Sequence, residues 1–187
     1  MNWKEKGGSY IVKSGEAKRI VDFYGAGGSL LDYGAGNRKF LRQMKDEGIS
    51  LAAADVEKFF DAPIPFYYVN GAKGIAEIPR TFDTITAWNV LEHIYDPKSV
   101  VEELGKKLNR NGLLIVSVPN VSSWLDRLLF LYYGEFHRYN KDNDHVFIFT
   151  NDTRDKVFAG WKLLNKNQVF IERLLGNTVC YVYQKNA

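Results

Sequence analysis

The sequence predicts an α/β fold, in which a seven-stranded, mostly parallel sheet ends in a C-terminal antiparallel hairpin and carries helices on both faces. Three observations support this prediction. Segments of helical and of strand periodicity alternate along the chain. The run at 113–118 is apolar throughout, as in a central parallel strand that is covered on both faces. The segments at 161–171 and 178–184 have the pattern of an antiparallel pair. With 187 residues, the chain is expected to form a single domain, 1–187.

In the first half of the chain, capping residues and glycines mark the expected elements. Ser14 suits the cap of a helix that ends near Tyr24, before a glycine-rich break. A second helix is expected to begin at Asn37 and to end at Gly48. Buried strands are expected at 29–33, 49–54 and 66–69, and a loop rich in Gly and Ala is expected to follow up to Pro79.

In the second half, the clearest helix begins after Asp96, a good N-cap, with Pro97 at its first position. It follows an alternating strand at 82–88 and leads through a tight turn at Asn111-Gly112 into the apolar strand. A last helix, capped by Thr150 or Asn151, should end near Gly160. The buried stripe of the clearest helix is expected to contain Val100, Val101, Leu104 and Leu108.

Composition excludes several classes of protein. Apolar residues make up 45% and charged residues 25%, which is typical of a soluble globular chain. The net charge is only +3, and no Lys/Arg run exceeds two, so the broad basic face of a duplex-binding protein is not evident and no nucleic-acid partner is expected. Cys180 alone cannot form an internal disulfide or a multi-thiolate zinc site. No apolar run is long enough to span a membrane and no signal peptide is apparent, so we expect a cytoplasmic protein.

A glycine loop, Gly34-Ala35-Gly36, follows the first strand where a helix is expected to begin. Ligands of open α/β sheets bind at the carboxyl ends of the strands, and glycines there allow a close approach to the backbone. A dinucleotide-binding loop would need a third glycine at position 39, where Lys39 stands. Asp32 precedes the glycines and would repel a phosphate. The loop therefore favours a cationic ammonium or sulfonium ligand.

Asp55 ends the second strand, 19 residues after Gly36. From this place a carboxylate can accept hydrogen bonds from both hydroxyls of a ribose. Val56 beside it could pack on an adenine ring. Each aspartate alone also has a structural interpretation as a cap or a solvated strand end, but the two together predict a nucleoside-bearing cation.

Four stretches of the chain resemble the class I S-adenosylmethionine-dependent methyltransferases, which have a Rossmann-like sheet. They are LLDYGAGNRKFL at 30–41, AAADVE at 52–57, FDTITAWNVLEHIYDP at 82–97 and LNRNGLLIVSVPN at 108–120. The stretch PNVSSWLDRLLFLYYG at 119–134 is similar to MetW-type enzymes, and Leu91-Glu92-His93 is similar to ubiquinone and menaquinone methyltransferases. The stretch HVFIFT at 145–150 resembles one that precedes a helix in many of these small-molecule enzymes.

The resemblance implies that S-adenosyl-L-methionine is the cofactor, S-adenosyl-L-homocysteine the product and a small molecule the methyl acceptor. It also implies the residues of the cofactor site. The first motif would hold the methionine end through Asp32, Tyr33, Gly34, Ala35 and Gly36. Asp55 and Val56 would hold the nucleoside, and Asn89, Val90, Leu91, Glu92 and His93 would line the reaction chamber.

Two departures from the family pattern change what is expected. The family usually carries an acid after the third strand that binds the adenine amino group, whereas this chain has Val69-Asn70-Gly71-Ala72, which leaves backbone groups or Asn70 for that role. Some quinone O-methyltransferases bind a divalent metal through an E-x-x-E-H element. Because Asn89 replaces the first Glu, no metal is predicted.

His93 is the candidate catalytic base, because it follows a strand end above the expected cofactor and has an ordinary pKa near neutrality. Alternatively, Glu92 and His93 begin a helical turn and orient the loop by hydrogen bonds. The segment from His137 to His145 could be a metal loop or a substrate lid. It lacks the glycine and the terminal Glu of a calcium loop, and a solvated loop is the expectation there.

Aromatic residues are concentrated after the fifth strand. The chain has 27 in total, and eight of them fall at 121–149, where even spacing would place about four. We expect this segment to be a substrate lid, with Trp124, Tyr133 and Tyr139 against an apolar or ring-containing acceptor. The alternative is that these rings pack the segment onto the sheet.

Two other functions stay open at this point. A nucleic-acid or protein methyltransferase is disfavoured by the modest charge and by Asn89-Val90-Leu91-Glu92 in place of an N-P-P-[YF] element. A module that binds the cofactor or a partner protein without turnover is compatible with the missing adenine acid. The oligomeric state is not predicted.

Overall fold

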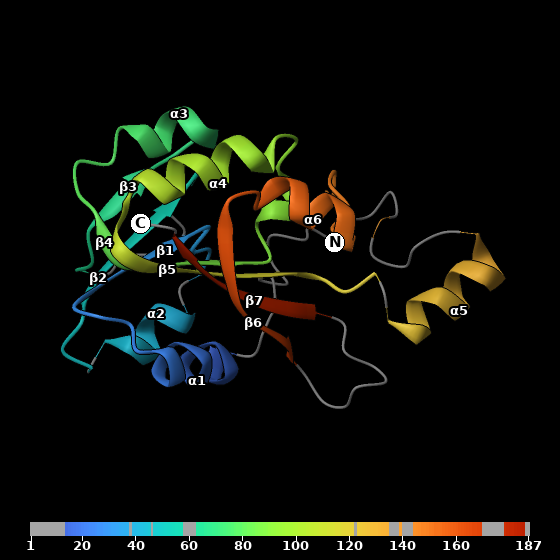
Figure 1. The fold of residues 1–187 in the computed structure, drawn as a ribbon. Helices are drawn as coiled ribbons and strands as arrows, with labels where there is room; N and C mark the ends of the chain where they lie inside the picture. Colours follow the sequence, from blue (N-terminus) through green and yellow to red (C-terminus); the bar gives the residue numbers. More distant parts are fainter. Residues whose placement is uncertain are drawn as a thin grey trace.

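Seven strands form one sheet in the order β3-β2-β1-β4-β5-β7-β6 (Figure 1). The structure is a computed structural model that describes residues 14–37, 39–45, 47–57, 63–121, 123–134, 139, 144–169 and 178–185. The strands are β1 (Ser29–Tyr33), β2 (Ser50–Asp55), β3 (Phe66–Tyr68), β4 (Phe82–Trp88), β5 (Leu108–Pro119), β6 (Trp161–Val169) and β7 (Thr178–Lys185). The helices are α1 (Ser14–Tyr24), α2 (Lys39–Met44), α3 (Gly71–Ala76), the short 3-10 turn η2 (Leu91–His93), α4 (Pro97–Lys106), α5 (Trp124–Tyr133) and α6 (Asn151–Val157).

The sheet has the predicted mixed character. Strands β1 to β5 pair in parallel, and β7 pairs antiparallel with both β5 and β6. The chain runs outward from β1 to β3 and then returns to the other side of β1 with β4. The strand order therefore reverses between β1 and β4, and a crevice at the carboxyl ends of these two strands is the usual ligand site of such sheets.

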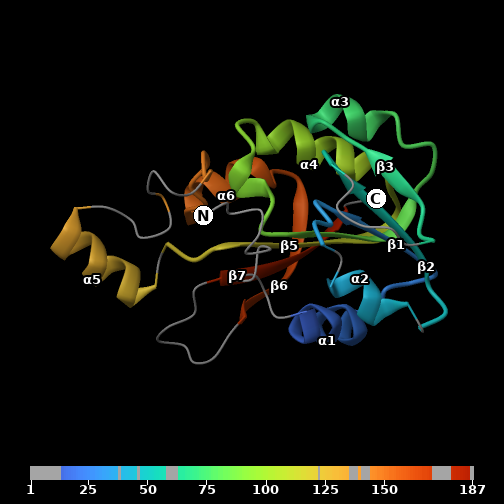
Figure 2. The same ribbon diagram turned by 180° about the vertical axis from the view of Figure 1, so that it is seen from behind.

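Alternate residues of the strands face two cores, one on each side of the sheet. Leu30 packs with Phe40 and Met44 under α1 and α2, whereas Leu31 packs with Val101 and Leu104 under α4. Figures 1 and 2 show α1 and α2 on one face and α3, α4 and α6 on the other. Because every residue of β1 is buried, its side chains are apolar except Ser29 and Asp32, and a buried Asp32 needs a partner.

The local capping chemistry is as expected. The Asp96 side chain accepts a hydrogen bond from the Ser99 N–H at 3.2 Å at the start of α4. Thr150 caps α6 through a reciprocal pair with Thr153, in which each side-chain oxygen accepts the other residue's N–H.

Three expectations about elements were wrong. The segment before Pro79, expected to be a loop, contains the helix α3. Its Gly71 and Gly74 are poor helix formers, so the sequence did not indicate a helix. Gly74 is required because an added Cβ would lie 2.8 Å from Val69 Cα. Leu108 belongs to β5, where it pairs with Phe82, and not to the stripe of α4. Asn111-Gly112 does not form a turn before β5 but lies inside that strand, as an irregularity in its pairing. The β4–β5 register shifts between Phe82 and Thr84, and Asn111 has φ 61°.

The segment at 121–149 contains the one long helix that the sequence reasoning did not anticipate. Figures 1 and 2 show α5 standing apart from the sheet and from the helices that cover it. Leu131 is 80% exposed and Tyr132 81% exposed on this helix. Within the described stretches, no helix combines the length and the apolar character that crossing a bilayer requires.

Candidate active site at the carboxyl ends of β1 and β4

The loop after β1 is tied to the end of β2. The N–H groups of Gly34 and Ala35 donate to the carbonyl of Ala54 at 2.7 and 3.3 Å, and the Gly36 N–H donates to Asp55 Oδ2 at 2.8 Å. All three donors are therefore used inside the protein. The loop can offer a ligand carbonyl oxygens and open space more readily than N–H groups, which suits a cation better than a phosphate.

Gly34 is needed because the loop lies directly against the segment after β4. Its φ of 72° is in the left-handed region, and an added Cβ would lie 2.9 Å from Val90 Cγ1 and closer still to Cγ2. Gly36 is also left-handed, at φ 50°, but nothing lies within 4 Å of the place of its Cβ. The first glycine brings the two strand ends together, and the second leaves an open space beside Asp55.

Asp32 is buried beneath this loop. Its carboxylate oxygen Oδ1 accepts a hydrogen bond of 2.7 Å from Thr86 Oγ1, and the two residues are direct partners in the β1–β4 register. The neighbouring residues of the motif turn their side chains away from the loop: Tyr33 lies in the core under α4 and Ala35 in the core under α1. Burial, with the negative charge of Asp55 as a smaller cause, raises the pKa of Tyr33 to about 12. Tyr33 and Ala35 can therefore touch a ligand only through their backbone.

Asp55 stands at the end of β2, partly exposed. Its Oδ2 accepts the Gly36 N–H at 2.8 Å and its Oδ1 accepts the Val56 N–H at 2.7 Å. Each carboxylate oxygen has a second lone pair, so both remain able to accept a hydroxyl of a ribose. Val56 is 67% exposed and offers an apolar surface beside the carboxylate. Asn70 is exposed at the start of α3, and its side chain makes no capping hydrogen bond there.

Asn89 is fixed to β5 and not to the glycine loop. Its N–H donates to the carbonyl and to Oγ of Ser117, both at 3.0 Å, while Ser117 Oγ donates to Asn89 Oδ1 at 2.7 Å. It has φ 52°, a left-handed conformation that Asn tolerates better than most residues. This turn ends β4 and directs the chain into Val90 and η2 beside the loop. Ser117 and Thr86 were missed by sequence reasoning, because their roles depend on which strands are neighbours.

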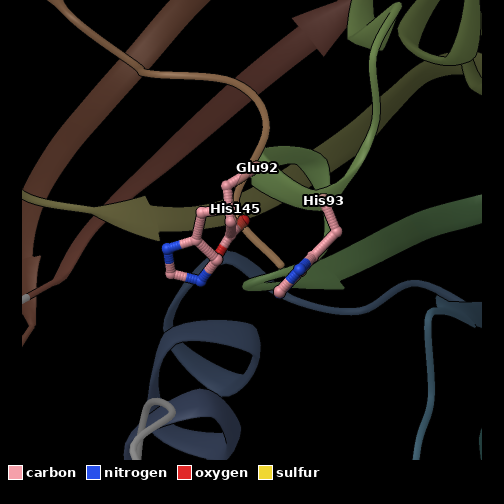
Figure 3. A group of neighbouring side chains, drawn as sticks. All are labelled: Glu92, His93 and His145. Atoms are coloured by element: carbon pink, nitrogen blue, oxygen red, sulfur yellow. The ribbon is translucent and has the colours of Figure 1, made fainter. Parts of the chain in front are cut away.

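Glu92, His93 and His145 come together beside this turn (Figure 3). Glu92 is fully buried, and its Oε1 lies 4.0 Å from His145 Nε2. The rings of His93 and His145 meet edge to face with centroids 4.7 Å apart. The candidate ligand atoms of the three side chains all lie within 4.8 Å of one another.

The backbone holds this cluster together. The carbonyl of Glu92 accepts the N–H groups of Val146 and Phe147 at 2.8 and 3.0 Å, and His93 Nδ1 lies 3.0 Å from the carbonyl of Asp144. Because a carbonyl can only accept, Nδ1 carries the proton and Nε2 keeps its lone pair when His93 is neutral. Leu91–His93 is indeed a helical turn that orients the neighbouring loop, as the alternative interpretation held.

The expectation of a solvated loop up to His145 was wrong for His145 itself, whose side chain is 13% exposed against Glu92. The residues that follow His145, Val146 and Phe147, donate their N–H groups to the Glu92 carbonyl, and this places the His145 side chain against Glu92. His137 lies outside the described residues. The sequence signals for His145 were its place in HVFIFT and its place at the end of a segment that could be a metal loop or a substrate lid.

The three aromatic residues expected at the substrate have different positions. Tyr139 lies beside the His145 ring: its hydroxyl donates to the Phe147 carbonyl at 3.1 Å, and the two ring centroids are 5.2 Å apart. Tyr133 is 68% exposed on α5, which stands apart from the sheet. Trp124 begins α5, and its side chain lies outside the described residues.

Two open hollows in the surface lie away from the strand-end site. One of about 390 Å³ is bordered by α4 and by Gly160 and Trp161 before and at the start of β6. The other, of about 480 Å³, lies at the amino ends of β1 and β4, next to Gly28 and Asp83. Neither is lined by a residue of the glycine loop or of η2.

Comparison with known proteins gives a consistent family assignment. The model of a methyltransferase domain family matches residues 13–160. The mitochondrial ubiquinone biosynthesis O-methyltransferase of Schizosaccharomyces pombe is 30% identical over 104 residues, covering 49% of this chain and 38% of that protein. The corresponding enzyme of Idiomarina loihiensis is 41% identical over 49 residues, covering 25% of this chain and 20% of that protein. The chain thus matches well under half the length of these curated relatives.

Solved structures share the fold at low sequence identity. The N-methyltransferase NodS from Bradyrhizobium japonicum, in complex with S-adenosyl-L-homocysteine, has a TM-score of 0.65 at 14% identity and covers 93% of this chain and 86% of that one. The 1,6-didemethyltoxoflavin N1-methyltransferase from Burkholderia thailandensis has a TM-score of 0.66 at 13% identity, with 91% and 76% coverage. Its structure holds both its acceptor and S-adenosylhomocysteine.

Proposed function

Because the chain belongs to this methyltransferase domain family, we propose that it transfers a methyl group from S-adenosyl-L-methionine to a small-molecule acceptor. The main support is the loop after β1, whose N–H groups are hydrogen-bonded to the end of β2. The loop lies between the buried Asp32 and the partly exposed Asp55. An acidic, donor-poor cradle suits a ligand that combines a positive charge with a ribose.

The residues present fit this cofactor at both of its ends. Asp32, held by Thr86, supplies negative charge beneath the loop for the ammonium and sulfonium groups, and the open space at Gly36 admits the ligand beside Asp55. Asp55 accepts the ribose hydroxyls while its two backbone bonds keep it in place. Val56 packs on the adenine, and Asn70 supplies the amide that replaces the usual acid for the adenine amino group.

When bound, the cofactor would supply an electrophilic methyl group: a lone pair of the acceptor would attack the methyl carbon in line as the carbon–sulfur bond breaks, and S-adenosyl-L-homocysteine would leave. The chain then has to position the acceptor and exclude water. Asn89 and Val90 form the wall opposite the glycine loop, and the 144–149 segment, fastened to the Glu92 carbonyl, closes the neighbouring side. If the acceptor is a hydroxyl, His93 Nε2 takes its proton, because Nδ1 is committed to the carbonyl of Asp144.

Several features support a small acceptor. The curated relatives are named for ubiquinone biosynthesis, and the toxoflavin enzyme is named for a small heterocyclic acceptor. Tyr139 places a ring beside His145, at the edge of the chamber. We propose that the acceptor is an apolar or ring-containing molecule that lies near Tyr139, and that the 121–149 segment covers it. A cytoplasmic location remains part of this proposal.

Titration calorimetry with S-adenosylhomocysteine tests the cofactor site. Wild-type protein should bind, and Asp55→Ala should weaken binding by at least about tenfold, since hydrogen bonds to a charged group are worth about 1.5–3 kcal/mol. Asp83→Asn, a change at the opposite ends of the strands, is the matched control and should bind as the wild type does. Absence of binding at millimolar ligand, or unchanged binding by Asp55→Ala, would refute the cofactor site.

A mass-shift screen of phenols, catechols, quinols and nitrogen heterocycles then tests turnover. A product heavier by one methyl group in place of hydrogen identifies the acceptor. Protein that binds the cofactor but methylates nothing in the screen would favour a module without turnover. Methylation of RNA or of a protein substrate, and of no small molecule, would favour the other alternative.

A further inference from the structure

We infer that Glu92, His93 and His145 form a binding site for a first-row divalent transition-metal cation such as Zn²⁺. The family resemblance gave no reason to expect it, because the E-x-x-E-H element lacks its first carboxylate. The structure shows that Asn89 is bonded to Ser117 on β5, and that a third donor comes instead from a segment about fifty positions later in the chain.

The donor set is suited to such an ion. Two imidazoles and one carboxylate are the ligands of many catalytic zinc sites, and they also suit iron, cobalt and nickel. Mg²⁺ and Ca²⁺ prefer oxygen ligands throughout. A divalent cation between the buried Glu92 carboxylate and the two rings would carry the charge opposite to that of the carboxylate.

To bind one ion, the ligand atoms of Glu92, His93 and His145 would have to move only slightly closer together. In a tetrahedral site, two ligand atoms bound to one ion at about 2.0–2.2 Å lie about 3.3–3.6 Å apart. Glu92 Oε1 and His145 Nε2 are 4.0 Å apart and the whole set lies within 4.8 Å, so closing the site needs movements of only about 0.4–1.5 Å. His93 is exposed, so its side chain can move to complete the site and provides a route of entry from solvent.

The surroundings also match those of a metal ligand. Ligating histidines usually donate their second N–H to a carbonyl or carboxylate, which fixes the ring and its tautomer. His93 Nδ1 lies 3.0 Å from the Asp144 carbonyl, which leaves Nε2 as the ligand. The Glu92 carbonyl holds the segment that carries His145 through hydrogen bonds from the N–H groups of Val146 and Phe147. These hydrogen bonds therefore hold the η2 turn and the segment at 144–147 against each other whether or not an ion is bound.

A metal ion and proton transfer to His93 exclude each other in the same molecule, because both use the Nε2 lone pair. With the ion bound, an acceptor hydroxyl within reach of the metal would lose its proton more easily through the positive charge. The metal site itself does not rest on methyl transfer, and binding is measured without the cofactor.

Full-length protein freed of metal by a chelator should bind Zn²⁺ in about a 1:1 ratio in titration calorimetry, and Co²⁺ should give visible absorption bands. His145→Ala and Glu92→Gln should each weaken Zn²⁺ binding by at least about tenfold, since even the outer partners of metal ligands are worth about 10–100-fold. Mg²⁺ in excess should not compete. Glu102→Gln, at an exposed residue of α4, is the matched control and should bind as the wild type does.

Circular dichroism checks that each variant is folded. If Glu92→Gln does not fold, His93→Asn replaces it, because this residue is exposed. The site is refuted if folded wild-type protein binds no Zn²⁺, if His145→Ala and Glu92→Gln (or His93→Asn in its place) bind as tightly as the wild type, or if Glu102→Gln loses binding equally.

Discussion

The contact between Gly34 and Val90 makes a sharp test of how the two strand ends are joined. Replacing Gly34 by Ala adds one carbon atom that has no room, because its Cβ would lie 2.9 Å from Val90 Cγ1 and closer to Cγ2. Carbon atoms without a bond between them are most favourable at about 3.5–4.0 Å. The backbone would also have to keep a φ of 72°, which disfavours any residue with a Cβ.

The expected loss of unfolding free energy has two parts. A left-handed backbone costs a non-glycine residue about 1–2 kcal/mol. Overpacking by one methyl group typically costs about 1–3 kcal/mol. Gly34→Ala should therefore lose about 2–5 kcal/mol. Gly36→Ala, with φ 50° and nothing within 4 Å, has only the first part and should lose about 1–2 kcal/mol. Gly25→Ala, with φ 75° and open space, is a second control at the other end of β1.

Urea unfolding of the wild type, the three glycine variants, Val90→Ala and the double variant Gly34→Ala/Val90→Ala measures these parts separately. Removing the two Val90 methyl groups should recover about 1–3 kcal/mol as a coupling energy in the double-mutant cycle, while the cost of the left-handed backbone remains. If Gly34→Ala is no more destabilising than Gly36→Ala and shows no coupling to Val90, the close approach of the two strand ends does not exist in solution.

Three further predictions concern other parts of the molecule. Burial raises the pKa of the Cys180 thiol to about 12, so a thiol reagent at pH 8 should modify native protein very slowly and urea-unfolded protein fast; equal rates would contradict the buried position. Hydrogen bonds from Asn109, Ser29 and Gly28 lower the pKa of Asp83 below its ordinary 3.8, so the stability it adds is present above that pH and is lost as the pH falls through the lowered pKa. Asp83→Asn should therefore cost about 1–2 kcal/mol at pH 7, and this difference should shrink in urea titrations below pH 3.8, whereas a constant difference would refute the linkage. Leu131→Gln, at a residue 80% exposed on α5, should change the unfolding free energy by no more than about 0.5 kcal/mol, against about 2–5 kcal/mol for Leu31→Ala in the core; a large loss at Leu131 would mean that α5 packs on the body in solution.

Local signals in the sequence were sufficient for most of the fold. The caps at Asp96 and Thr150, the break at Gly25 and the apolar run in β5 depend on neighbouring residues, and the expected elements follow them closely. Helix α3 was missed because Gly71 and Gly74 are poor helix formers, and the close packing on Val69 that selects Gly74 is tertiary. Helix α5 was missed because apolar residues occupy all of its faces and leave no clear 3.6-residue period.

The candidate site divides in the same way. The sequence alone was sufficient to select Asp32, Gly34, Gly36 and Asp55. They stand where predicted strands end, and glycines and acidic residues at such places are recognisable from the neighbouring sequence. Thr86 and Ser117 could not, because they become partners of Asp32 and Asn89 only once β4 lies between β1 and β5. His145 is separated from Glu92 by more than fifty positions, and nothing in either segment alone indicates their contact.

The position of β7 between β5 and β6 has a consequence for how the chain folds during synthesis. Strand β6 reaches the sheet only through β7, and β7 is the last of the strands to leave the ribosome. Until then, β5 has a long apolar edge whose backbone groups are unpaired, and such edges recruit other chains. We therefore expect nascent chains that stop before Thr178 to need a chaperone or to aggregate, although they already contain every residue assigned to the cofactor site.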